Sequence, residues 1–118
     1  MERNFENLFI WQESRTLIFS IYRIMENSKD YGFKDQIQRA AVSIMNNIAE
    51  GFESGSDAKF VNFLNISRGS CAEVRSMLYL CEDLGLCSNC ERESLQKQVR
   101  MITSGIVKLV DSLSKSTE

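Results

Sequence analysis

The chain has 118 residues, which suits one domain with one hydrophobic core over residues 1–118. Hydrophobic residues make up 43% and charged residues 25%, a balance typical of a folded globular protein rather than a disordered one. Fourteen Lys and Arg oppose sixteen Asp and Glu, and this net charge of -2 argues against a strongly basic nucleic-acid-binding protein. The chain lacks histidine, the commonest acid–base catalyst and metal ligand, and it lacks proline.

The N-terminal residues are polar and mixed in charge, unlike the apolar core of a secretory signal. No apolar run approaches the roughly 20 residues that a membrane-spanning helix needs. We therefore expect a cytoplasmic protein without membrane contact, whose four cysteines are free thiols.

Apolar residues recur at helical spacing in four segments, which predict helices over residues 8–27, 33–50, 57–84 and 90–113. In the first segment, the residues expected to share the buried face are Trp11, Ile18, Ile21, Tyr22 and Met25. A polar cluster that ends in Gly32 predicts the turn into the second helix.

The second segment carries Ile37, Ala41, Ile44 and Ile48 at spacings of four, three and four. Gly51 follows it, where a left-handed C-terminal cap is expected. The sequence Ser-Gly-Ser-Asp at 54–57 then predicts a turn and the N-cap of the third helix.

The third segment has two apolar stripes, which is more than one bundle core normally buries. The main stripe is Phe60, Phe63, Leu64, Cys71, Val74 and Leu78, and the second is Ile66, Met77, Leu80 and Leu84. This surplus predicts that the helix also buries surface against another subunit.

The fourth segment opens with a Ser-x-x-Glu capping box at Ser88 and Glu91. Its apolar positions alternate by four and three, at Leu95, Val99, Ile102, Ile106, Leu109 and Leu113. Four amphipathic helices joined by short connections predict an all-α, antiparallel up-down-up-down four-helix bundle.

Polar residues also form a stripe on the second helix, at Gln36, Arg39, Ser43, Asn47 and Glu50. Such a stripe is most often a solvated face. Small apolar residues flank it at Ala40, Val42 and Ala49, so a tight interface, where each unsatisfied polar group would cost about 1–3 kcal/mol, is the alternative.

The segment 36–44 (QIQRAAVSI), followed by 47–51 (NIAEG), resembles the signature of the bacterial 23S rRNA intervening-sequence proteins. Phe5, Leu8 and Trp11 resemble the opening of that family, and the segment 63–73, which ends in Glu73, resembles its third-helix motif. The resemblance covers about residues 5–113. This family is similar in fold to the accessory subunit of diversity-generating retroelements, which acts beside a reverse transcriptase.

The resemblance implies a left-handed antiparallel four-helix bundle that assembles as a homopentamer, with no established catalytic residues and no cofactor. It also suggests an association with nucleic acid, RNA or DNA. Met45 stands where the family usually has proline, so a kink of the second helix should be weaker here. The net charge of -2 likewise departs from a basic nucleic-acid-binding protein.

These considerations predict two groups of functional residues. The polar determinants of bundle or interface geometry are Gln36, Arg39, Ser43, Asn47, Glu50 and Glu73. Arg68 and Arg75, seven residues apart on the third helix, are the candidates for contact with an anionic partner, although Glu82 continues the same line.

Cys87 and Cys90 form a C-x-x-C motif, which is typical of a redox pair or of half a zinc site. A redox pair normally lies in a βαβ setting, and a zinc site needs about four ligands, so two incidental thiols explain the motif better. The sequence therefore predicts no catalytic, cofactor-binding or metal-binding residues. It favours a non-enzymatic oligomeric scaffold that associates with nucleic acid. The alternatives are an adaptor for a protein partner such as a reverse transcriptase, and a thiol redox or metal role for the cysteine pair.

Overall fold

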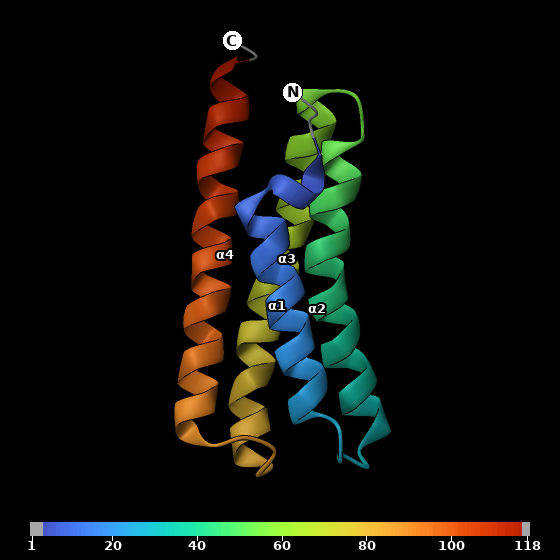
Figure 1. Cartoon of the computed structure of the whole chain (residues 1–118), viewed down its shortest axis with the longest axis vertical. Helices are drawn as coiled ribbons and strands as arrows, with labels where there is room; N and C mark the ends of the chain where they lie inside the picture. The colour runs from blue at the N-terminus through green and yellow to red at the C-terminus, as the bar shows by residue number, and fades with distance from the viewer. Residues whose placement is uncertain (1–3, 117–118) are drawn as a thin grey trace.

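Four α-helices make up the computed structural model, which describes residues 4–116 (Figure 1). A short 3₁₀ turn, η1, precedes them, and the elements are η1 (Phe5–Asn7), α1 (Phe9–Ile24), α2 (Tyr31–Phe52), α3 (Asp57–Asp83) and α4 (Asn89–Ser116). The connections lie at alternate ends of the molecule, so successive helices run up and down as predicted (Figure 1). The left-handed sense of the bundle stays a prediction. None of the described helices has the length and apolar character needed to cross a membrane.

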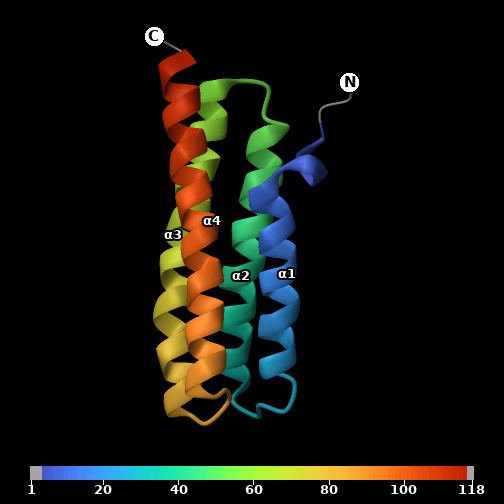
Figure 2. The ribbon, with the colours of Figure 1, turned by 60° about the vertical axis from the view of Figure 1, so that its left-hand side comes forward.

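Each helix packs against two neighbours. α1 and α3 both contact α2 and α4. α1 and α3 do not contact each other, so they occupy opposite corners of the bundle. Figure 2 shows α3 and α1 on opposite sides of the molecule, which measures 48 × 24 × 20 Å. The outer faces of α1 and α3 therefore point in different directions.

Local hydrogen bonds explain where the second helix begins. The side chain of Asp30 accepts the N–H of Phe33 at 3.1 Å, which makes it the N-cap. α2 therefore starts at Tyr31, two residues before the predicted start, and α1 ends at Ile24, three residues before the predicted end. From Tyr31, α2 continues as one α-helix across Met45.

The prediction that Gly51 caps the second helix is wrong. Gly51 lies inside α2 and is buried, and among the described residues only Gly55 and Gly85 have positive φ. A Cβ atom on Gly51 would lie 2.8 Å from both Phe60 Cδ1 and Phe63 Cβ of α3. Glycine is therefore required here for close helix approach, not for backbone conformation.

The turn between α3 and α4 is fixed by a cap on each helix. Gly85, at a φ of 73°, ends α3 in a Schellman motif, in which the N–H of Leu86 reaches the carbonyl of Cys81 at 2.8 Å. The predicted capping box opens α4, because the N–H of Ser88 donates to Glu91 Oε1 at 2.9 Å and the N–H of Glu91 donates to Ser88 Oγ at 3.1 Å.

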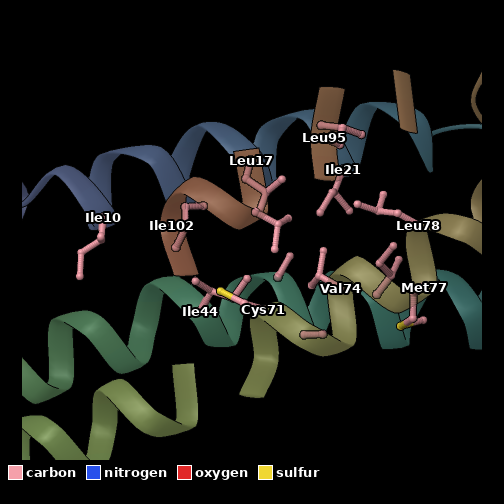
Figure 3. Packing of buried hydrophobic residues seen from close by; sticks show 14 of the residues in the cluster. Ile10, Leu17, Ile21, Ile44, Cys71, Val74, Met77, Leu78, Leu95 and Ile102 are labelled. Atoms are coloured by element: carbon pink, nitrogen blue, oxygen red, sulfur yellow. The ribbon is translucent and has the colours of Figure 1, made fainter. Parts of the chain in front are cut away.

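The core contains apolar side chains from all four helices, and they converge between α1, α2, α3 and α4 (Figure 3). The main predicted stripes of the second, third and fourth helices supply most of it. On α1 the buried face differs from the prediction, since Tyr22 is 46% exposed while Ile10 and Ser14 are buried. Ser14 is accommodated there because its hydroxyl donates to the carbonyl of Ile10 at 2.6 Å.

Candidate functional site

The middle of the polar stripe on α2 lies against α3. Ser70 Oγ donates to Ser43 Oγ at 2.9 Å, and Asn47 Nδ2 donates to the same Ser43 oxygen at 2.9 Å. One turn away, buried Ser67 donates its hydroxyl to the carbonyl of Ile44 at 2.8 Å. Ser43 and Asn47 are therefore half-buried groups of the contact between α2 and α3. Ser70, the partner of Ser43, and Ser67, the partner of Ile44, are both small residues of α3.

The other four residues predicted as polar determinants face solvent. Gln36, Arg39, Glu50 and Glu73 are all exposed. Arg39 Nε forms an ion pair with Asp35 Oδ2 at 2.9 Å, one turn earlier on the same helix. The contact between Ser43 and Ser70 places this side of α2 beside one outer edge of α3.

That edge of α3 carries the surplus apolar residues noted in the sequence. Ile66, Glu73 and Leu80 follow one another at intervals of seven, so they share one line on the helix. Ile66 is 54% exposed, Leu80 48% and Leu84 54%, whereas Met77 is buried. We call this surface the α2/α3 face, and it comprises Gln36, Arg39, Glu50, Ile66, Glu73, Leu80 and Leu84.

Arg68 and Arg75 lie on the opposite side of α3, toward α4. They line a surface groove of about 450 Å³ together with Gly69, Ala72 and Thr103. Thr103 comes from α4, so the groove runs between two helices, and we call it the α3/α4 groove. Because Gly69 and Ala72 have small side chains, the two guanidinium groups border a hollow rather than a filled surface.

Glu82, which continues the line of Arg68 and Arg75, is already paired. Arg92 of α4 donates a hydrogen bond to Glu82 Oε1 and a second one, at 2.7 Å, to Gln96 Oε1. The hydrogen bond from Arg92 holds the pKa of Glu82 below its ordinary value. Glu82 therefore does not offset the charge of the two groove arginines.

A third exposed arginine, Arg100 of α4, lies near the groove lining and was not singled out from the sequence. It lies one turn from Thr103 and one turn from Gln96, whose Nε2 donates to the carbonyl of Arg75 at 2.9 Å. The sequence does carry a signal for it, because residues 94–110 contain Lys97, Arg100 and Lys108 but no acidic residue. In the part of the chain that the structure describes, Arg68, Arg75 and Arg100 have no carboxylate partner.

The outer side of α1 alternates aromatic and arginine side chains. The guanidinium of Arg15 lies 5.8 Å from the ring centre of Trp11, and that of Arg23 lies 5.8 Å from the ring centre of Phe19. Phe19 is 64% exposed. We call this surface the α1 face, and it comprises Trp11, Arg15, Phe19, Tyr22 and Arg23.

The Cys87 thiol of the C-x-x-C motif is not activated. Cys87 is buried, and its pKa is raised by burial and by the nearby carboxylates of Glu91 and Glu82. Cys90 is exposed on the first turn of α4. Cys71 and Cys81 are core residues, and burial raises their pKa values to about 11 and about 12. Across residues 4–116, no group of three or more Cys, Asp or Glu could hold a metal ion.

Glu82 and Glu91 also lack the electrostatics of a general acid. Glu82 and Glu91 have shifted pKa values, and both are lowered. In Glu91 the main cause is the hydrogen bond from the backbone N–H of Ser88. A general acid needs the opposite shift, toward the protonated form at neutral pH. The exposed arginine, aromatic and apolar side chains are suited to binding rather than to proton transfer.

The described helices define an antiparallel four-helix-bundle protein. A family model described as 23S rRNA-intervening sequence protein matches residues 6–108. The chain therefore belongs to this family, as its sequence motifs predicted. Among curated proteins, none matches the chain in sequence.

The crystal structure of another protein has a similar fold. It is that of a protein of unknown function from the S23 ribosomal protein family of Bacteroides thetaiotaomicron, and it superposes with a TM-score of 0.79. The two chains are 24% identical, and the alignment covers 86% of this chain and 97% of the other. Neither description indicates a catalytic activity.

Proposed function

We propose that this protein is a non-enzymatic, self-associating helical scaffold that binds the phosphates of nucleic acid through the α3/α4 groove. The observation that carries the proposal is that Arg68 and Arg75 line one groove without a carboxylate partner among residues 4–116. Exposed Arg100 lies one turn from Thr103, which lines the same groove from α4. The exposed apolar edge of α3 supports self-association. The resemblance to the family implies a homopentamer.

The net charge of -2 does not oppose this proposal. Exposed charges more than about 10 Å apart are largely screened at 0.1 M salt, so a phosphate responds mainly to the groups beside it. Arginine also presents a planar fork of N–H donors that matches a phosphate group in a bidentate manner. Arg68 and Arg75 are seven residues apart on α3, which corresponds to about 10 Å along the helix axis.

The absence of enzymatic function is supported by the chemistry of the side chains. The chain has no histidine to serve as a base. The pKa of Cys87 is raised, which disfavours the reactive thiolate. The pKa values of Glu82 and Glu91 are lowered, which disfavours the protonated form that a general acid needs. Binding is thus the activity that the described surfaces support.

The test is a salt titration of binding to labelled structured RNA and to duplex DNA, with the double variant Arg68→Ala/Arg75→Ala. Its control is Lys29→Ala/Lys34→Ala, which removes the same charge near the opposite face of the bundle. The wild type should bind less tightly as salt rises. In the groove variant, the slope of the logarithm of the binding constant against the logarithm of salt concentration should become shallower by about two units, roughly one for each lost phosphate contact.

Two results would overturn the proposal. The first is no binding even at low salt, which would favour the adaptor function with a protein partner. The second is an equal loss of nucleic-acid affinity in the groove variant and the lysine control, which would show that binding depends on total charge and not on the groove.

A further inference from the structure

The α1 face and the α2/α3 face are two different exposed surfaces on opposite parts of the bundle. α1 and α3 occupy opposite corners, and Figure 2 shows them on opposite sides. Each surface exposes large apolar groups, Phe19 and Tyr22 on the first and Ile66, Leu80 and Leu84 on the second. Large exposed apolar side chains that gather on one face mark interaction surfaces.

The α1 face carries two arginines against one neighbouring carboxyl group, that of exposed Glu6, which lines the same hollow as Trp11, Arg15 and Phe19. Arg15 and Arg23 are exposed, and neither has a carboxylate partner in the described chain. Glu13 is the one acidic residue within α1. Its side chain points toward α4, where Glu13 Oε2 accepts a hydrogen bond from Nε2 of Gln98 at 3.1 Å. Arginine and aromatic side chains are also the types most enriched in protein–protein interfaces.

The α2/α3 face has the opposite character. Glu50 and Glu73 are exposed and without a hydrogen-bond or ion-pair partner among residues 4–116. Arg39 is already neutralised by Asp35. Lys59, on the first turn of α3, adds a positive charge only at one end of this edge.

The charges on the two faces have similar spacings. Arg15 and Arg23 are eight residues apart, or about 12 Å along α1. The contact between Ser43 and Ser70 sets the register of α2 against α3, and in this register Glu50 and Glu73 are about 15 Å apart along the axis. Long arginine side chains can span a difference of this size.

We propose that the α1 face of one copy binds the α2/α3 face of a second copy, with Arg15 and Arg23 opposite Glu50 and Glu73. This inference rests on the self-association in the proposed function and specifies the surfaces that produce it. Because the two faces differ, the contact is heterologous, and each copy keeps one face free for the next. The α2/α3 face spans two helices rather than the outer side of α3 alone, so the two faces are inclined and successive contacts curve.

This mode of association leaves the α3/α4 groove open. Arg68 and Arg75 lie on the side of α3 that faces α4, away from the edge that carries Ile66 and Glu73. Each copy in the assembly would therefore present its groove to a nucleic acid. A ligand that contacts several copies would gain affinity without any additional type of contact.

The test uses two variants of the full chain, each of which disrupts one face. Arg15→Glu/Arg23→Glu reverses the charge of the α1 face, and Ile66→Asp/Leu80→Asp places charge on exposed positions of the α2/α3 face. Native mass spectrometry and light scattering should find each variant monomeric alone. A mixture should form a one-to-one heterodimer and no larger species, because one intact α1 face meets one intact α2/α3 face.

Arg68→Glu/Arg75→Glu is the matched control, since it makes the same charge change in the groove and should keep the wild-type assembly. Circular dichroism establishes that each variant is folded. An assembly that persists unchanged in both face variants would overturn this inference alone. Two monomeric variants that fail to form a heterodimer would show an isologous contact instead. A wild-type chain that is monomeric at all concentrations would overturn the self-association itself.

Discussion

At two helical glycines, neighbouring helices approach closely. A Cβ atom on Gly51 would lie 2.8 Å from side-chain atoms of Phe60 and Phe63, and one on Gly105 would lie 2.5 Å from Ile10 Cγ2. Glycine inside a helix costs about 0.5–1 kcal/mol relative to alanine. The close contact of α2 with α3, and of α1 with α4, therefore depends on residues that weaken the isolated helices.

Gly51→Ala should lower the free energy of unfolding by about 1–3 kcal/mol, because overpacking of Phe60 and Phe63 outweighs the gain in helix propensity. Gly69→Ala is the control, since no atom lies within 4 Å of its added methyl group. That variant should gain about 0.5–1 kcal/mol. Urea unfolding of both variants measures the difference, and equal stabilisation would show that α2 and α3 are not in close contact at Gly51.

The error over Gly51 shows what a sequence leaves open at this scale. Glycine after an apolar repeat is typical both of a left-handed cap and of a close helix contact. The second role can be recognised only from the residues of the neighbouring helix that face the glycine. For Gly51 these are Phe60 and Phe63, which are nine or more positions away in the sequence. Tyr22 is a similar case, because its spacing fits the core but the buried hydrogen bond of Ser14 favours a rotated face.

At the scale of elements, the turn between α3 and α4 combines features that the sequence does and does not predict. The capping box was predictable because Ser88 and Glu91 are three residues apart and act within one helix turn. The pair of Arg92 with Glu82 was not, because its partners are ten residues apart on different helices. The polar contact of Ser43 with Ser70 was hidden for the same reason.

The pair of Arg92 with Glu82 should make the stability of this turn depend on pH. Since folding lowers the pKa of Glu82, the folded chain releases its proton more readily than the unfolded chain. The stabilisation is therefore present above the ordinary value of 4.5 and is lost as pH falls through the lower folded value. Glu82→Gln should be less stable than wild type at neutral pH and should lose less stability on acidification.

Urea unfolding across this pH range measures both effects. Asp83→Asn is the control, because Asp83 is the adjacent exposed carboxyl and has no ion-pair partner in the described chain. An identical pH profile for wild type and Glu82→Gln would mean that the pair with Arg92 does not stabilise the turn.

At the scale of the whole molecule, the arrangement of charges matters more than their sum. The net charge of -2 argued against contact with nucleic acid. The stretch 94–110 contains no acidic residue, and the structure pairs Glu82 with Arg92. The number and order of the helices were predictable from apolar periodicity, whereas the charge on each face depends on contacts between helices.

Self-association through the α1 face predicts that the wild-type thermal midpoint rises with protein concentration, because association stabilises only the folded chain. Arg15→Glu/Arg23→Glu should remove this dependence, whereas Arg68→Glu/Arg75→Glu should retain it. Thermal unfolding followed by circular dichroism over a wide concentration range measures the slope of the thermal midpoint against protein concentration. The same slope in all three proteins would place the contact elsewhere on the bundle.

The unequal lengths of the helices give the bundle two different ends. α1 has 16 residues and α4 has 28, or about 24 Å and 42 Å of helix. The last turns of α4 therefore extend beyond α1, where Leu109 and Leu113 are only half-buried (Figure 1). We expect amide protons there to exchange with solvent through local opening, and those in the four-helix section to exchange mainly on global unfolding. Cooperative unfolding is thus a property of one part of the rod, and the other part can loosen while the fold persists.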